Sequence, residues 1–226
     1  MPFIFSFYFL KNNKKKELKV FFVYTILLIS LILIFAICRY VFKSQQIYRI
    51  FERLFVIAEF ALISRFFILN IIEDNLKKII NFLIVLIMIF SIYDYITSFN
   101  QDFTYYPLVL ECLLFPIVII LFFYEKMKYS TKYPIYLSPA FWIAVAFLIF
   151  STGNFFLFLF SKMLLQNSEN KKLYNDIYGF FTILKNILLC VAVIVAKKFK
   201  IKDETADINI NLELETFIPY NPQANL

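Results

Sequence analysis

Two glutamates, Glu59 and Glu111, lie within long apolar stretches of the chain. A carboxylate in a hydrocarbon environment is energetically costly, so it is expected to have a partner, a water-filled cavity or a chemical role. Other polar residues lie in comparable stretches, namely Arg65, Asn154, Lys185 and Asn186. These residues and the two glutamates form the candidate ligand-binding set of this protein.

Several chemistries are compatible with this set. The charged groups could pair only to hold helices in register, as buried polar groups sometimes do. They could instead bind a small ligand or an ion, or the glutamates could reach the headgroup layer. Paired carboxylates could also activate water in an intramembrane hydrolase similar to lysoplasmalogenase-type enzymes. Lys185 could form a Schiff base with an aldehyde. No further motif in the sequence selects one of these chemistries.

The rare residue types exclude other kinds of site. The chain has no histidine, which excludes histidine-based triads and the usual zinc sites. Its two glycines cannot build a glycine-rich phosphate-binding loop. The three cysteines lie in apolar stretches without metal-type spacing and are interpreted as small buried hydrophobic residues. We therefore expect no metal, no cofactor and no catalytic residue, and we favour a protein that is not an enzyme.

The composition is that of a membrane protein. Of the 226 residues, 62% are hydrophobic and 17% are charged, whereas a soluble domain has roughly a quarter charged residues. The formal net charge is +7, but the lysines cluster at the ends of apolar blocks. This clustering is typical of topology signals and headgroup anchors. The expected partner is thus the lipid bilayer, and nucleic acid is not expected.

Six apolar blocks are each long enough to cross about 30 Å of hydrocarbon as a helix. The sequence predicts an all-α polytopic transmembrane bundle at residues 20–198, with spans near 20–42, 54–72, 79–98, 107–124, 139–161 and 176–196. The second block is expected to extend back to about Ser44 as one long helix. Ser138 followed by Pro139 predicts a helix start, because the hydroxyl can cap the helix and proline suits its first turn.

The lysines and arginines predict the orientation of the bundle. Six spans place both termini on one side, which would hold 14 of the 23 basic residues, while seven would lie on the other side. Because basic loops remain in the cytoplasm, we expect both termini there and the bundle in a bacterial inner membrane.

This topology sets the depth of the candidate residues. Glu59 would lie about 8 Å and Glu111 about 6 Å below the outer boundary. Asn154 would lie in the outer half, with Arg65 and Lys185 nearer the midplane and Asn186 beside Lys185. Polar groups at matching depth on different helices should face one another rather than lipid. The sequence therefore predicts a polar pocket open to the outside.

The flanks of the bundle differ from it in pattern. Residues 1–19 are interpreted as a short apolar stub followed by a basic cytoplasmic flank. Residues 199–226 are interpreted as a cytoplasmic tail, which is expected to be disordered. Within the tail, residues 208–215 alternate strictly between apolar and polar, as a strand does. An alternative prediction is therefore a strand that adds to the sheet of a partner protein.

Several short motifs resemble those of a known family. The most specific are Phe141-Trp142-Ile143 and Gly153-Asn154-Phe155-Phe156, and the others are Ile47-Tyr48 leading to Glu59-Phe60, Leu110-Glu111-Cys112-Leu113-Leu114 and Lys185-Asn186-Ile187-Leu188-Leu189. Over most of residues 15–197 the chain resembles a family of small uncharacterised multi-span membrane proteins of Bacteroidetes-type bacteria.

The resemblance implies a fold but no assigned activity. Members usually have seven spans, which implies that residues 1–10 are the remainder of a shortened first helix. Members often carry a histidine near the position of Tyr178, and its absence here leaves no histidine role to transfer. A tendency to accompany sensor kinases favours a signalling role.

The sequence as a whole predicts an integral membrane protein with an outward-facing polar pocket. Glu59 and Glu111 would line the pocket, Asn154 would orient a small ligand, and Lys185 or Arg65 would balance charge. We favour a sensor or accessory subunit whose tail contacts a membrane or cytoplasmic partner protein. A small-molecule or ion transporter is one alternative, and the hydrolase is another.

Overall fold

The computed structural model describes residues 16–37, 45–97, 106–129, 134–165 and 168–216 of the chain. Within these ranges all regular structure is helical, which confirms the all-α prediction. The helices are α2 (Lys16–Ile37), α3 (Gln45–Asn70), α4 (Asp74–Thr97), α5 (Tyr106–Lys128), η2 (Ile135–Leu137), α6 (Pro139–Leu159), α7 (Ser161–Leu164) and α8 (Ser168–Thr216). The apolar stub predicted at residues 1–10 lies outside the described residues.

Four helices in the described ranges are long and apolar enough to cross a membrane. They cover Asp74–Thr97, Tyr106–Lys128, Pro139–Leu159 and Asn170–Lys197. A shorter apolar stretch, Lys19–Ser30, lies in α2. In hydrocarbon a chain must satisfy its backbone hydrogen bonds internally, and a helix does so within one segment.

The helix boundaries follow local sequence signals. α6 begins at Pro139, and the backbone amide of Ala140 donates to the Ser138 hydroxyl at 3.3 Å, which confirms the predicted cap. α3 begins at Gln45, which confirms one long helix from about Ser44. The strand interpretation of residues 208–215 is wrong, because α8 continues through them to Thr216. Although apolar and polar residues alternate strictly in this segment, it continues the preceding helix instead of forming a strand.

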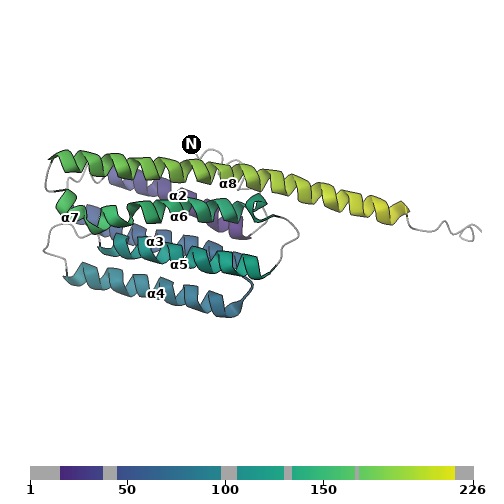
Figure 1. Ribbon diagram of the computed structural model, residues 1–226, viewed down its shortest axis with the longest axis horizontal. Helices are drawn as coiled ribbons and strands as arrows, with labels where there is room; N and C mark the ends of the chain where they lie inside the picture. The colour runs from purple at the N-terminus through teal and green to yellow at the C-terminus, as the bar shows by residue number, and fades with distance from the viewer. Residues whose placement is uncertain (1–15, 38–44, 98–105, 130–133, 166–167, 217–226) are drawn as a thin grey trace, which may run out of the picture.

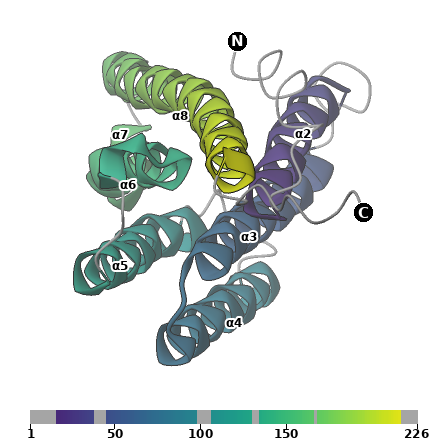
Figure 2. The ribbon, with the colours of Figure 1, turned by 90° about the vertical axis from the view of Figure 1, so that its right-hand side faces the viewer.

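The long helices run side by side, and successive ones are antiparallel (Figure 1). α6 packs most extensively on α8 and α5, and α2 packs on α3. α4 packs on α3 and α5 and lies at one edge of the bundle (Figure 2). α8 continues past the end of the bundle (Figure 1). The interior is thus enclosed by α3, α5, α6 and α8 together with α2, whose Phe21 and Tyr24 are buried in the core.

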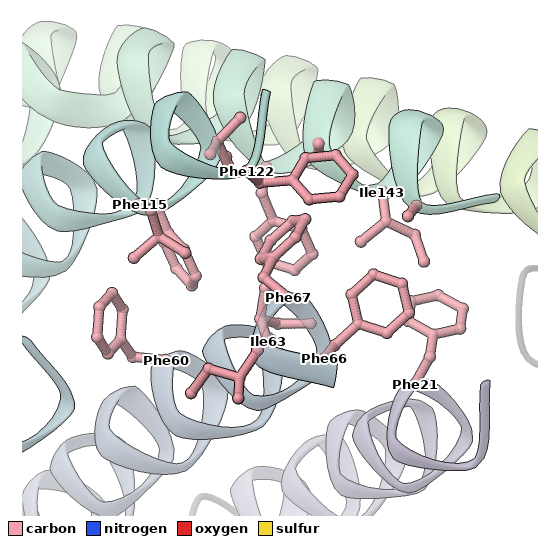
Figure 3. Packing of buried hydrophobic residues seen from close by; sticks show 14 of the residues in the cluster. Phe21, Phe60, Ile63, Phe66, Phe67, Phe115, Phe122 and Ile143 are labelled. Atoms are coloured by element: carbon pink, nitrogen blue, oxygen red, sulfur yellow. The ribbon is translucent and has the colours of Figure 1, made fainter. Parts of the chain in front are cut away.

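The main core cluster combines phenylalanine rings with aliphatic side chains, chiefly isoleucine (Figure 3). The rings of Phe60 on α3 and Phe115 on α5 have centroids 5.0 Å apart. Phe115 also lies 5.0 Å from Phe147 on α6. Such tilted ring contacts add to the stabilisation that the buried apolar area provides.

The outward face of α4 is apolar. Its exposed side chains include Phe82, Val85, Ile89, Ile92 and Ile96. A soluble protein rarely exposes so continuous an apolar surface. This face is suited to contact with lipid acyl chains.

Candidate functional site

The structure brings Glu59 and Lys185 together in the interior. Glu59 is 5% exposed and Lys185 is 6% exposed. The ammonium Nζ of Lys185 donates to Oε1 of Glu59 at 3.3 Å. The hydroxyl of Tyr24 donates to the same oxygen at 2.7 Å. Helices α2, α3 and α8 therefore meet at one carboxylate oxygen.

Two aromatic rings of α6 surround the charge of Lys185. Its Nζ lies 3.9 Å from the centroid of the Phe150 ring and 5.2 Å from that of Phe147. A cation over an aromatic face is stabilised by the quadrupole of the ring, and more strongly where water is excluded. The lysine is thus held by one carboxylate and two rings, which makes its buried position tolerable.

Glu111 of α5 lies near this ion pair and is 4% exposed. It interacts electrostatically with both Glu59 and Lys185. Its Oε1 is fully buried and has no hydrogen-bond partner within the described part of the chain. The two glutamates therefore lie near each other in the interior. Neighbouring side chains donate hydrogen bonds to Glu59, whereas Oε1 of Glu111 receives none from the described residues.

Asn154 of α6 is fully buried. Its Nδ2 donates to the backbone oxygen of Phe150 at 2.8 Å. Its Oδ1 is buried without a hydrogen-bond partner among the described residues. The adjacent Gly153 lies against α8, where an added Cβ would come 2.3 Å from the Phe181 ring. The glycine thus permits the close approach of α6 and α8 on which the Lys185 contacts depend.

Ring contacts fix the relative levels of these residues along the bundle. Phe115 of α5 lies level with Phe147 of α6. Because α5 and α6 are antiparallel, one turn back from Phe115 brings Glu111 level with Ser151, and Asn154 is less than one turn beyond. Cys112 belongs to a second apolar cluster with Leu157 and Phe158 of α6, which lies toward the end of the bundle at which α5 begins.

The polar interior therefore has two layers. The first layer contains Tyr24, Glu59 and Lys185, whose groups bond to one another. The second layer contains Glu111 and Asn154 and lies toward the end of the bundle at which α5 begins. We call these the paired layer and the open layer. The open layer holds two acceptor oxygens that lack donors among the described residues.

Two of the predicted site residues do not join either layer. The side chain of Arg65 on α3 is exposed, and the residue lies five positions before the helix end at Asn70, roughly 7.5 Å along the axis. Such a side chain can extend to the headgroup region. Asn186 beside Lys185 is partly buried. Lys185 rather than Arg65 is therefore the cation that faces the glutamates.

Tyr24 and Phe150 were not predicted as part of the site. The position of Tyr24 offered a usable signal, because it lies within an apolar block rather than in an aromatic belt at a span end. Phe150 offered none, since phenylalanine is abundant throughout the chain.

Another buried carboxylate, that of Glu125, lies at the opposite end of α5 from Glu111. Its Oε1 accepts from the backbone amide of Ile72 at 2.8 Å, and its Oε2 accepts from that of Glu73 at 3.2 Å. Lys126 donates to the backbone oxygen of Asn70 at 2.7 Å. This cluster joins the end of α5 to the connection between α3 and α4. The burial of Glu125 could not be predicted from the sequence, because the residue lies beside lysines at a helix end, where exposed charges are usual.

A third charged pair lies between α3 and α4. Arg53 donates to Oδ2 of Asp94 at 2.7 Å, and its guanidinium lies 5.4 Å from the Tyr95 ring. An apolar pocket of about 210 Å³ adjoins this pair. Ser91, Arg53 and Tyr95 contribute to its lining. The pair joins two neighbouring helices near the predicted outer side.

The described residues contain no group of three or more His, Cys, Asp or Glu side chains that could hold a metal ion. Comparison of the chain with protein-family models, with curated proteins and with solved structures finds no match. The site therefore has to be interpreted from its own geometry.

Proposed function

We propose that the chain is a six-span integral protein of a bacterial inner membrane, with both termini in the cytoplasm. The spans would be α2, α3, α4, α5, α6 and the Asn170–Lys197 part of α8. Four of these have the length and apolarity of spans. The remaining two are α2 and α3, and the charged side chain of Glu59 in α3 is buried and paired with Lys185 of α8, as intramembrane charges usually are. The distribution of lysine and arginine supports the orientation.

We further propose that the polar interior binds a small ligand and that the protein acts as a sensor or accessory subunit. One observation carries this proposal. Lys185, which bonds to Glu59 inside the bundle, lies on the same helix that continues past the bundle to Thr216. A change at the site would thereby act on a helix that reaches beyond the membrane. A cytoplasmic partner protein would contact the chain at this end.

The pocket hypothesis requires that water reach the open layer from outside. The test uses a chain in which Cys38, Cys112 and Cys190 are replaced by alanine, so that a single introduced thiol can be followed. Asn154→Cys should react with a membrane-impermeant, cationic thiol reagent added to the outer side of intact cells. The reaction requires the thiolate, which forms only where water has access.

Phe156→Cys is the matched control. Phe156 lies on the same helix, two residues from Asn154, but its side chain is 64% exposed on the outer face of the bundle. In a bilayer this position faces acyl chains, and its thiol should react slowly. Equal reaction of the two variants, or no reaction of Asn154→Cys, would contradict an outward-facing pocket.

An ion-coupled transporter is the second candidate. The unpartnered oxygen of Glu111 next to the Glu59–Lys185 pair favours it, because buried acidic groups that exchange partners are typical of ion pathways. Flux across proteoliposomes that contain the purified chain would distinguish transport from sensing. The hydrolase is not favoured, since Oε1 of Glu59 is occupied by Tyr24 and Lys185.

A further inference from the structure

The open layer offers acceptors without donors. Oε1 of Glu111 and Oδ1 of Asn154 are both buried and unpartnered within the described ranges. Leaving such oxygens unbonded in a low-dielectric interior is costly. A species that occupies this layer must therefore present hydrogen-bond donors or a positive charge to oxygen.

The charges of the two layers indicate how much positive charge is needed. When ionised, Glu59 and Glu111 carry two negative charges and Lys185 carries one positive charge, and the three groups interact electrostatically. Tyr24 and Cys112 also interact electrostatically with these groups, and Tyr178 interacts with Tyr24; all three are neutral in their protonated forms. One negative charge is left without compensation, which in a buried site favours the uptake of a single cation.

The ligand chemistry also excludes some ions. A divalent cation usually takes six or more oxygen ligands, including several carboxylates. The described residues contain no group of three or more His, Cys, Asp or Glu side chains that could hold such an ion. A carboxylate oxygen and an amide oxygen are hard ligands that suit hard cations, and the single uncompensated negative charge matches a monovalent ion or an ammonium group.

We propose that Glu111 and Asn154 bind one small monovalent cation, of the size of Na⁺ or a primary ammonium ion. This inference depends on the proposed ligand site and specifies the class of its ligand. The carboxylate of Glu111 supplies the charge, and the amide oxygen of Asn154 supplies a second ligand. Lys185 remains paired with Glu59 and does not enter the cation site.

The test measures the thermal unfolding of the full chain in detergent micelles. Sodium chloride or methylammonium chloride is titrated at constant ionic strength against choline chloride, whose quaternary ammonium is larger and has no N–H donor. The Tm should rise and saturate with one of the small cations, since a ligand that binds only the folded state stabilises it. A Tm that depends on pH but not on the cation would show that Glu111 takes up only a proton, and would overturn the proposal.

Three variants locate the effect. Glu111→Gln should raise the half-saturating cation concentration about tenfold or more, because a bond to a charged group is lost. Asn154→Asp adds a carboxylate to the layer and should lower that concentration, which keeps the test informative if Glu111→Gln does not fold. Glu125→Gln is the matched control, a buried glutamate outside the layer, and it should leave the concentration unchanged. An equal response in all three variants would overturn the proposal.

The cation titration and the thiol reaction can each give a negative result independently, and the two negative results have different meanings. If Asn154→Cys reacts from outside and no cation changes the Tm, the pocket remains and its ligand is of another class. If Asn154→Cys does not react, the pocket itself is contradicted.

Discussion

The two ends of α5 carry buried glutamates in contrasting surroundings. Both oxygens of Glu125 accept bonds from backbone amides of the α3–α4 connection. Oε1 of Glu111, by contrast, has no hydrogen-bond partner among the described residues. Backbone donors cannot be exchanged without moving the chain, so Glu125 is a fixed structural joint. Glu111 lies where an exchangeable species can complete its bonds. The difference separates a carboxylate that holds helices from one that can bind a ligand.

The largest effect is expected from breaking the ion pair of the paired layer. It tests whether this pair holds the helices together, as Glu125 does at the other end of α5. Lys185→Met removes the cation and leaves Glu59 buried with only Tyr24, which should cost about 3 kcal/mol or more of unfolding free energy. The measurement is chemical denaturation of the purified chain in detergent. Glu59→Gln combined with Lys185→Met removes both charges and should recover most of the loss. Equal losses in the single and double variants would show that the pair is not coupled.

The next effect breaks the joint at the other end of α5. Glu125→Ala leaves the backbone amides of Ile72 and Glu73 without their acceptor, at a cost of about 2 kcal/mol. The matched control is Glu73→Gln, whose side chain is partly exposed and pairs with Lys128 at 3.0 Å. That substitution should change stability little, because exposed ion pairs contribute little. If Glu73→Gln lost more unfolding free energy than Glu125→Ala, then Glu73 rather than Glu125 would be the glutamate that stabilises this end of α5.

Tyr24→Phe sharpens the description of the paired layer. It removes the hydroxyl that donates to Oε1 of Glu59 at 2.7 Å, and a bond to a charged group contributes about 1.5–3 kcal/mol. We expect a loss near the lower end of that range, since Lys185 still bonds to the same oxygen. Thr25→Val, one residue further along α2, is a control whose hydroxyl bonds only within its helix. A loss no greater than that of the control would contradict the role of Tyr24.

The smallest expected effect concerns packing rather than charge. Gly153→Ala would place a Cβ 2.3 Å from the Phe181 ring, and relieving that contact should cost about 1 kcal/mol. Gly179→Ala has no neighbouring atom within 4 Å, so it should be neutral or slightly stabilising. Thermal unfolding of the two variants provides the comparison. A neutral Gly153→Ala would mean that α6 and α8 can separate freely beside the site.

The sequence was sufficient to predict the features that depend only on the order of residue types along the chain. Long apolar blocks predict long helices, and the Ser138 cap and the start of α3 follow from local chemistry. Matching depth also predicted that Glu59, Glu111 and Lys185 would converge, because polar groups avoid lipid. These inferences require only the position of each residue along its helix.

The remaining features depend on the rotation of each helix about its axis, which the apolar pattern does not determine. Most side chains of these helices are hydrophobic on every face, so no polar stripe marks the interior. For this reason the exposure of Arg65 and the inclusion of Tyr24 were not foreseen. The burial of Glu125 depends on the α3–α4 connection, which is 52 residues away in the sequence at Glu73.

The continuity of α8 has a mechanical consequence. Thirty-one residues separate Lys185 from Thr216 along one helix, which corresponds to roughly 46 Å at 1.5 Å per residue. Beyond Lys185, α8 contributes buried residues to the core, namely Leu189, Ala192, Val193 and Ala196. The part that can move as an arm therefore extends from about Ala196 to Thr216, roughly 30 Å. A tilt of about 5° at its base would displace the distal end by roughly 2.6 Å. A change in how α8 packs beside the ion pair would thus be larger at the distal end of the helix than at the ion pair itself.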